Sequence, residues 1–243
     1  MIQSIRNQLG SIRKVYLRGN AIEKRGDFAQ YPETVLLLHG FFQTRNIWEV
    51  MEKRLRNHGY GVLSLDLGGV LDRFNSNDID VQARWLAQKL EGIFAKYKFN
   101  SLHIIGHSMG GLVARLYIQE YGGDKRVLSL CTLGTPHHGT PVGLIGVILM
   151  AGGLLSRAPY QMLPNSRIVQ KIRSENFPSH IELTSVFSSS DLICPWWCSV
   201  LRYHKTEHNI HNRKFRKIGH SELTHHPLIF DAVKQHLLRA KKP

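Results

Sequence analysis

Three residues whose types suit nucleophilic catalysis occur in the order serine, aspartate, histidine: Ser108, Asp191 and His220. A serine hydroxyl is a weak nucleophile near neutral pH, so it needs a base to take its proton and an acid to orient that base. In such a set the imidazole of His220 would accept the proton of Ser108 and later return it to the leaving alcohol. Asp191 would hold the imidazole in the productive tautomer and stabilise its charged form. The residue types and their order predict a catalytic triad.

The sequence around Ser108 has the pattern Gly-x-Ser-x-Gly, with Gly106 and Gly110 on either side. The apolar run 102–105 predicts a buried strand before the motif, and apolar residues at helical spacing follow it at 112–117. On such a strand-to-helix turn, glycines remove the Cβ atoms that would collide with the adjacent strand and helix. The serine hydroxyl then stands clear of the sheet, near helix N–H groups that favour negative charge. The motif in this setting indicates that Ser108 is the nucleophile.

Several histidines compete with His220 for the role of the base. His225 and His226 lie only a few residues further on. The Gly-His-Ser setting directly after a predicted strand favours His220, whereas His226 is suited to cap the helix that follows it. His137 and His138 are interpreted as structural residues.

The acid has one competitor. Asp191 comes at the end of a predicted strand, although a lone aspartate at such a place is often a turn or cap residue. Asp66 also ends a predicted strand, but it precedes Ser108 and therefore breaks the order serine, acid, histidine. We expect Asp191 to be the acid.

The tetrahedral intermediate of an acyl transfer needs two N–H donors for its oxyanion. The backbone N–H of Met109, at the start of the helix after Ser108, is one candidate. The other is expected in the loop after His39 and Gly40, where the N–H of Phe41 is best placed. Four further residues are expected to contact substrate: Phe42, His107, Leu144 and Ile145.

Apolar runs alternate with helical patterns along most of the chain, which predicts an α/β fold with a mostly parallel sheet and helices on both faces. In a parallel sheet the carboxyl ends of the strands meet along one edge, so residues that follow different strands come together there. The predicted strands are 35–38, 62–66, 102–105, 126–133, 181–187 and 214–218, and the predicted helices begin near 44, 79, 112, 166 and 227.

The chain length of 243 residues fits one domain, 1–243, and the alternation is interrupted once. Residues 142–155 are almost entirely apolar apart from glycine, and a second short helix is indicated over 166–172. We interpret about 139–180 as a cap or lid insertion, with an ordinary core helix as the alternative. An apolar cap would suit an acyl-chain substrate and exclude water from the reaction.

The formal net charge is +14, and the excess lies at both ends of the chain. Residues 1–25 hold six Lys/Arg against one acid, and residues 202–243 hold ten against three. Ile2, Ile5, Leu9 and Ile12 recur at helical spacing, so 1–18 is a candidate basic amphipathic helix, with a segment that packs on the protein or frays as the favoured alternative. No nucleic-acid motif or aromatic platform accompanies the charge, which argues against nucleic acid. Peripheral contact with an anionic membrane is a candidate interaction, with a solvated basic surface as the alternative.

Cysteine usage and the absence of a long apolar segment give expectations about location. Cys131 lies in an apolar strand and is expected to be a free thiol, and Cys194 and Cys198 are too close in sequence to assert a bridge. No apolar core follows Met1, and no run reaches the ~18 apolar residues of a membrane-spanning helix. We expect a cytoplasmic protein that is able to associate with a membrane surface.

Five motifs together resemble the lipase and esterase branch of the α/β-hydrolase superfamily, including bacterial triacylglycerol lipases and enzymes that deacylate glycosylphosphatidylinositol. The similarity covers about 35–238, without the basic ends. The motifs are His-Gly-Phe (39–41), Gly-His-Ser-Met-Gly-Gly (106–111), Gly-Thr-Pro-His-His-Gly-Thr (134–140), Ser-Asp-Leu-Ile-Cys-Pro (190–195) and Gly-His-Ser (219–221).

The resemblance implies hydrolysis of carboxylic esters through an acyl-enzyme, without a cofactor or metal. We expect a small-molecule or lipid ester with an apolar acyl chain as the substrate. A thioesterase, an amidase or an acyltransferase on the same triad remains an alternative, because the pocket selects the leaving group and the acceptor. A non-catalytic binding protein and a membrane-surface module are the alternatives from other classes.

Overall fold

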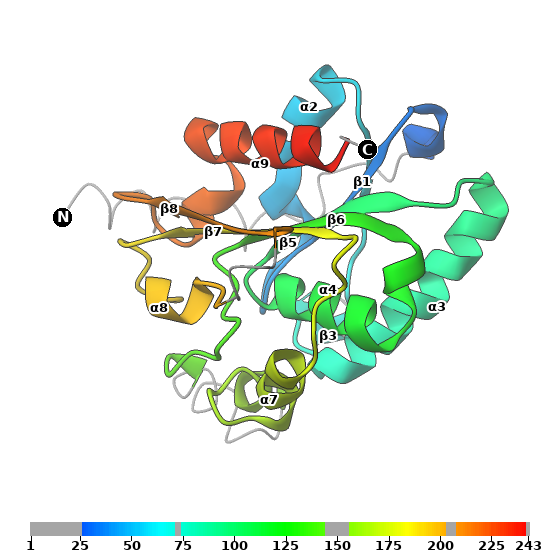
Figure 1. Cartoon of the computed structure of the whole chain (residues 1–243). Coiled ribbons are helices and arrows are strands. Elements are labelled where there is room, and N and C mark those ends of the chain that lie inside the picture. Colours follow the sequence, from blue (N-terminus) through cyan, green and yellow to red (C-terminus); the bar gives the residue numbers. More distant parts are fainter. Residues whose placement is uncertain (1–25, 71–73, 144–155, 203–207, 242–243) are drawn as a thin grey trace.

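The computed structural model describes residues 26–70, 74–143, 156–202 and 208–241. Its centre is a six-stranded sheet with the strand order β2-β1-β5-β6-β7-β8, in which every neighbouring pair is parallel (Figure 1). The strands are β1 (Thr34–Leu38), β2 (Gly61–Ser64), β5 (Leu102–His107), β6 (Val127–Leu133), β7 (Glu182–Ser188) and β8 (Ile210–Phe215). A separate antiparallel pair consists of β3 (Gly69–Val70) and β4 (Phe74–Asn75).

Helices cover both faces of the sheet, with α2 and α9 on one face and α3 and α4 on the other (Figure 1). The α-helices are α2 (Glu49–Asn57), α3 (Ile79–Tyr97), α4 (Met109–Glu120), α6 (Ala158–Gln161), α7 (Arg167–Ser174), α8 (Trp196–Ser199) and α9 (Pro227–Ala240). The 3-10 helices are η1 (Asp27–Gln30), η2 (Arg45–Trp48), η3 (Gly123–Lys125) and η5 (Ser221–Thr224).

Strand β1 shows why the sheet needs two covered faces. Its five residues are all buried, and successive side chains point to opposite faces. Leu36 and Leu38 belong to the apolar cluster that contains α3 and α4, whereas Val35 and Leu37 belong to the cluster with α2 and α9. The α/β fold predicted from the alternating pattern, with a parallel sheet and helices on both faces, is confirmed.

The last strand lies earlier in the chain than predicted. The predicted span 214–218 was wrong, because β8 runs over Ile210–Phe215. β8 is an edge strand whose residues after Ile210 are half-buried or exposed, so its sequence lacks an apolar run. Lys217, at a φ of 60°, has left the extended conformation, and Ile218 packs in the apolar cluster beneath α9. The burial of Ile218 explains its strand-like appearance in the sequence.

The region predicted as an insertion is partly described. The helix expected over 166–172 is present as α7, whose N-cap Ser166 accepts a hydrogen bond from the N–H of Val169 (3.2 Å). The guanidinium of Arg115 on α4 donates to the carbonyl of Ile172 (2.9 Å) and ties α7 to the core. Residues 144–155 lie outside the described ranges, so the cap, its apolar segment and the domain division stay predictions.

The thiols of Cys131, Cys194 and Cys198 are free and buried, as expected for Cys131. Burial raises the pKa of Cys131 to about 12, which keeps this thiol neutral. The amphipathic segment predicted for 1–18 lies outside the described residues. Within the ranges that are described, no helix has both the length and the apolar character that crossing a bilayer requires.

Candidate active site

Ser108 occupies the turn between β5 and α4 in a conformation that is rare for a residue with a side chain. Its φ is 53° and its ψ is −124°, which costs about 1–3 kcal/mol. A Cβ atom at Gly106 would lie 2.7 Å from the Cα of Gly111, and one at Gly110 would lie 2.6 Å from the carbonyl oxygen of His39. The steric role predicted for Gly106 and Gly110 is confirmed, and the turn presents the serine at the carboxyl end of the sheet.

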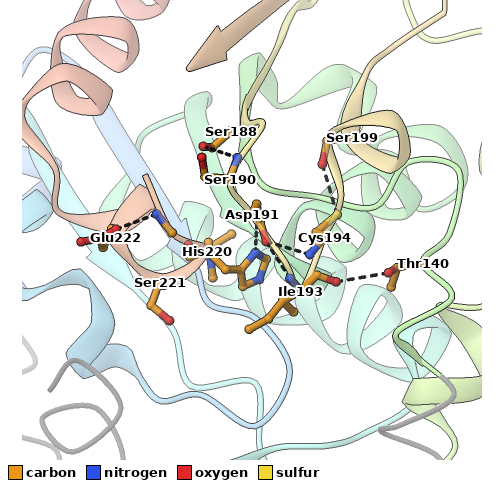
Figure 2. A network of polar contacts seen from close by, with 12 residues as sticks. Thr140, Ser188, Ser190, Asp191, Ile193, Cys194, Ser199, His220, Ser221 and Glu222 are labelled. Atoms are coloured by element: carbon orange, nitrogen blue, oxygen red, sulfur yellow. Dashed lines mark hydrogen bonds and ion pairs between the residues drawn. The ribbon is translucent and has the colours of Figure 1, made fainter. Parts of the chain in front are cut away.

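Asp191 and His220, 29 residues apart, meet in a buried hydrogen bond. The Nδ1–H of His220 donates to Oδ2 of Asp191 at 2.7 Å, and the two side chains are 5% and 0% exposed (Figure 2). Oδ1 of Asp191 accepts the backbone N–H groups of Ile193 (2.9 Å) and Cys194 (2.8 Å). Because the carboxylate accepts at both oxygens, it selects the imidazole tautomer that carries its proton on Nδ1. Nε2 is then free to act as a base.

The ends of β6 and β7 create room for this pair. Asp191 follows β7 through a short turn in which its N–H donates to the carbonyl of Ser188 (3.3 Å). Gly134 follows β6 with a φ of 58°, and a Cβ atom there would lie 3.1 Å from Nδ1 of His220. It would also lie 3.2 Å from Oδ2 of Asp191. Glycine is therefore needed at 134, a requirement that the sequence pattern alone did not identify.

A buried network connects the nucleophile turn to the loop of the base. Oε1 of Gln43 accepts the backbone N–H of Gly40 (2.8 Å) and contacts Nδ1 of His107 (2.9 Å). Nε2 of His107 lies 3.1 Å from the carbonyl oxygen of His220, and the centres of the two imidazole rings are 4.6 Å apart. His107 precedes Ser108, so the network places His220 beside the serine. In the described part of the chain, Ser108 and His220 do not hydrogen-bond to each other, which is common before substrate binds.

His107 has two oxygen atoms as partners and only one proton to offer when it is neutral. Its side chain is fully buried, and burial holds its pKa well below the usual 6.5. The neutral ring donates either to Gln43 or to the carbonyl of His220, and the other contact is left without a proton. Both ring nitrogens contact the protein, and a role of His107 in substrate binding stays a prediction.

The loop after β1 passes directly beside Ser108. A Cβ atom at Gly40 would lie 2.8 Å from the Cβ of the serine, and Phe42 has a φ of 55°. The rings of Phe41 and Phe42 are 5.8 Å apart, and both are partly buried. Met109 is the first residue of α4, where backbone N–H groups have no partner inside the helix. The oxyanion role of Phe41 and Met109 stays a prediction, and Leu144 and Ile145 lie outside the described residues.

The competing histidines have other partners. His226 caps α9 through Nδ1, which accepts the N–H of Leu228 (3.2 Å), as the sequence predicted. His137 is buried, with Nε2 near Thr132 Oγ1 (2.9 Å), and burial holds its pKa well below the usual value. His138 contacts the carbonyl of Val200 (2.8 Å) through Nε2. These positions agree with the structural interpretation of His137 and His138.

Asp66, the competing acid, lies away from the histidine of the pair. Its carboxylate is 3.9 Å from the guanidinium of Arg45, on the side of the molecule formed by β2. His39 is also buried, and burial lowers its pKa to about 4. Of the candidate residues, the structure brings together Asp191 and His220 beside the turn of Ser108.

The sheet and the solved structures similar to it show that the chain has the α/β-hydrolase fold, and the sequence comparisons agree with this over part of the chain. The model of the family described as "alpha/beta hydrolase fold" matches residues 33–149, from β1 through Ser108 to just beyond β6. The resemblance to the lipase and esterase branch is confirmed by two curated relatives, a GPI inositol-deacylase of Candida albicans and triacylglycerol lipase 2 of Saccharomyces cerevisiae. They are 29% identical over 117 residues and 30% identical over 121 residues.

These matches cover 47% and 48% of this chain but 23% and 36% of the two relatives, so the chain spans well under half of their lengths. Solved structures match over more of the fold. Mature Bacillus licheniformis lipase BlEst2 has a TM-score of 0.68 at 17% identity, covering 90% of this chain and 96% of that one. Aspergillus fumigatus lipase B has a TM-score of 0.69 at 14% identity, covering 86% and 53%. At these identities the structures establish the fold.

Proposed function

We propose that the chain is a serine hydrolase that cleaves carboxylic esters through an acyl-enzyme. The observation that carries the proposal is the buried 2.7 Å hydrogen bond between Asp191 and His220, beside the strained turn that presents Ser108. A purely structural role for this pair would not require a serine in a strained conformation next to it. Such strain concentrates at functional sites.

In the proposed reaction, Oγ of Ser108 attacks the ester carbonyl carbon while Nε2 of His220 takes its proton. The oxyanion would be stabilised by the N–H groups of Phe41 and Met109, and losing one such donor typically costs about 3 kcal/mol of barrier. Collapse expels the alcohol, which receives the proton from His220. Water then attacks the acyl-enzyme by the reverse proton path and releases the carboxylic acid.

The proposed substrate is an ester with an apolar acyl chain. The family resemblance and the apolar composition of residues 142–155 support this choice. One curated relative is named for deacylation of GPI and the other for triacylglycerol, both of which are lipids. A thioester, an amide or transfer to an acceptor other than water would use the same three residues.

The test is a series of p-nitrophenyl esters from acetate to palmitate, assayed with wild type and Ser108→Ala. Wild-type turnover that rises toward long chains and is abolished in the variant would support a lipase, and a maximum at short chains would support an esterase. Ser174→Ala, an exposed serine on α7, is the matched control and should keep full activity. Turnover that survives in Ser108→Ala at the wild-type rate would contradict the mechanism.

A further inference from the structure

The segment after Asp191 exposes four large apolar side chains within six residues. We call Leu192, Ile193, Trp196 and Trp197 the apolar patch; their exposed fractions are 75%, 51%, 38% and 54%. The rings of the two tryptophans are 6.0 Å apart. Single exposed apolar residues are ordinary, but a cluster of this kind marks an interaction surface.

Buried side chains and hydrogen bonds fix the segment so that the apolar patch faces outward. Cys194 and Cys198 of the same segment are 1% and 3% exposed, so these two side chains anchor the segment in the core. The hydroxyl of Thr140 donates to the carbonyl of Ile193 (3.2 Å), and the N–H of His138 donates to the carbonyl of Cys198 (3.1 Å). Figure 1 shows α8, which carries both tryptophans, beneath the edge of the sheet formed by β7 and β8. The exposed side chains therefore belong to a constrained segment.

A rim of positive charge borders the patch. Nζ of Lys214 on β8 lies 4.5 Å from the centre of the Trp196 ring. Lys217, just after β8, donates its N–H to Oγ of Ser190 (3.0 Å), which places this turn next to the segment that follows Asp191. Residues 192–202 and 208–219 contain no aspartate or glutamate. Their basic residues, all exposed, are Arg202, Arg213, Lys214, Arg216 and Lys217.

We propose that the apolar patch and its basic rim dock the protein on an anionic phospholipid surface. Tryptophan rings favour the headgroup level of a bilayer, and lysine and arginine are attracted to anionic lipids. A second copy of the chain fits this face poorly, because a two-fold contact would bring Lys214 and Lys217 close to their own counterparts. The net charge of +14 adds to that repulsion and favours an anionic partner.

The patch is joined directly to the candidate active site. The N–H of Ile193 binds Oδ1 of Asp191, whose Oδ2 accepts the hydrogen bond from His220 (Figure 2). Docking would therefore place the site at the lipid surface, where an ester substrate can enter without crossing water. This last step rests on the proposed function, whereas the docking itself does not require catalysis.

The four tryptophans of the chain allow docking to be observed directly. Trp48 is buried, Trp85 lies on α3, and the other two form the patch. Vesicles of phosphatidylcholine and phosphatidylserine with brominated acyl chains should quench the fluorescence of the full chain. Trp85→Phe should retain this quenching, and Trp197→Phe should lose a large part of it. Quenching that disappears in Trp85→Phe would overturn the proposal.

Affinity for the same vesicles without bromine, measured by co-sedimentation, gives a second test. Leu192→Ser combined with Trp197→Ala should lower the affinity at least about tenfold, because these side chains would lose their lipid contacts. The matched control, Leu238→Ser with Trp85→Ala, changes an exposed leucine and tryptophan elsewhere and should bind as wild type. Equal losses in the two double variants would overturn the proposal.

Charge is tested with Lys214→Gln, which should weaken binding about fivefold, and with Lys53→Gln on α2, which should not. Binding should decrease with added salt and be weakest on vesicles of phosphatidylcholine alone. A lipid-free dimer that dissociates in the patch variant would instead assign the patch to self-association. All vesicle experiments are repeated in Ser108→Ala, so a failed mechanism and a failed docking surface give different results.

Discussion

Two groups of buried histidines lie on the central sheet, and their partners differ. At the carboxyl end of the strands, His220 donates to the carboxylate of Asp191. Nearer the amino ends, His236 of α9 contacts Oγ1 of Thr184 (2.8 Å) and Oγ of Ser129 (2.9 Å). Oγ of Ser129 also lies 2.8 Å from Nδ1 of His103. His220 hydrogen-bonds directly to a carboxylate. The other group is bridged by neutral hydroxyls, and its nearest carboxylate in the described residues, that of Glu33, lies 3.8 Å from Nε2 of His103.

The difference in partners determines what each histidine can do. An adjacent carboxylate stabilises the imidazolium that forms when a base takes a proton. Burial lowers the pKa of His103 to about 4 even though the carboxylate of Glu33 lies 3.8 Å from its Nε2. Burial also holds the pKa of His236 well below 6.5, so both rings stay neutral. The group around His236 links β6, β7 and α9 as part of the core. Burial alone therefore does not make a histidine a catalytic residue.

Removing the carboxylate should have the largest effect. Asp191→Asn keeps the size of the side chain. The amide no longer selects the tautomer of His220 that carries its proton on Nδ1, and it does not stabilise the imidazolium. We expect turnover to fall by up to ~10⁴, with the fold retained. Ester hydrolysis and circular dichroism test this, with the exposed Asp231→Asn as the control. A loss below tenfold would place the acid elsewhere.

Removing a histidine from the other group should affect stability and leave the chemistry intact. His236→Leu leaves the hydroxyls of Ser129 and Thr184 without this partner, so the free energy of unfolding should fall by about 2–4 kcal/mol. Urea unfolding measures this loss, and kcat of the folded variant should equal that of wild type. His58→Leu, at an exposed position, is the control. A kcat effect without a loss of stability would contradict the division between the two groups.

The buried neutral histidines also predict acid sensitivity. A pKa that is lower in the folded than in the unfolded state means that unfolding takes up protons below pH 6.5, so stability rises with pH. His39 and His103, both with a pKa of about 4, should lower the unfolding free energy progressively between pH 6.5 and 4. Each contributes at most about 1.4 kcal/mol per pH unit.

The measurement is urea unfolding at several pH values with wild type and His103→Asn. The variant should show a shallower decline toward acid pH, because one buried imidazole no longer resists protonation. At pH 7.5 and above, the pH dependence from this group should be absent in both proteins. An unchanged acid slope in the variant would contradict this prediction, because it would mean that the pKa of His103 is the same in the folded and unfolded states.

Much of the fold could be predicted from the sequence because the signals are local and strong. The stripe over 79–97 corresponds to α3, and the run 35–38 corresponds to β1. Asp191 and His220 could be proposed because residues that follow parallel strands meet at one edge. The misplaced β8 shows the limit, since an edge strand with polar side chains has no apolar run to reveal it.

Contacts between distant elements could not be predicted in the same way. The group around His236 joins residues from β5, β6, β7 and α9, and none of them has a distinctive local pattern. Gln43 is a loop glutamine, and its role depends on Gly40 and His107 lying beside it. Such networks require the three-dimensional arrangement of the chain, whereas strands and helices follow from periodicity.

Gln43 allows a test between the two kinds of histidine environment, because His107 lies in the candidate site but has only neutral partners. Gln43→Leu removes the oxygen that accepts the Gly40 N–H and contacts His107. The loop beside Ser108 should then shift from its position. We expect kcat to fall about fivefold with little change in KM, as for the loss of one or two ordinary hydrogen bonds. Gln43→Glu keeps both acceptors and should restore much of the rate.

Gln43→Glu also gives His107 the carboxylate that it lacks. An anionic partner favours the imidazolium, which can donate to Glu and to the carbonyl of His220 at once, so the pKa of His107 should rise. The pH dependence of kcat should gain a titration that Gln43→Leu does not show, and NMR of the imidazole protons should detect the same step. If the two variants have identical rates and pH profiles, the bridge from Gly40 through His107 does not position the site.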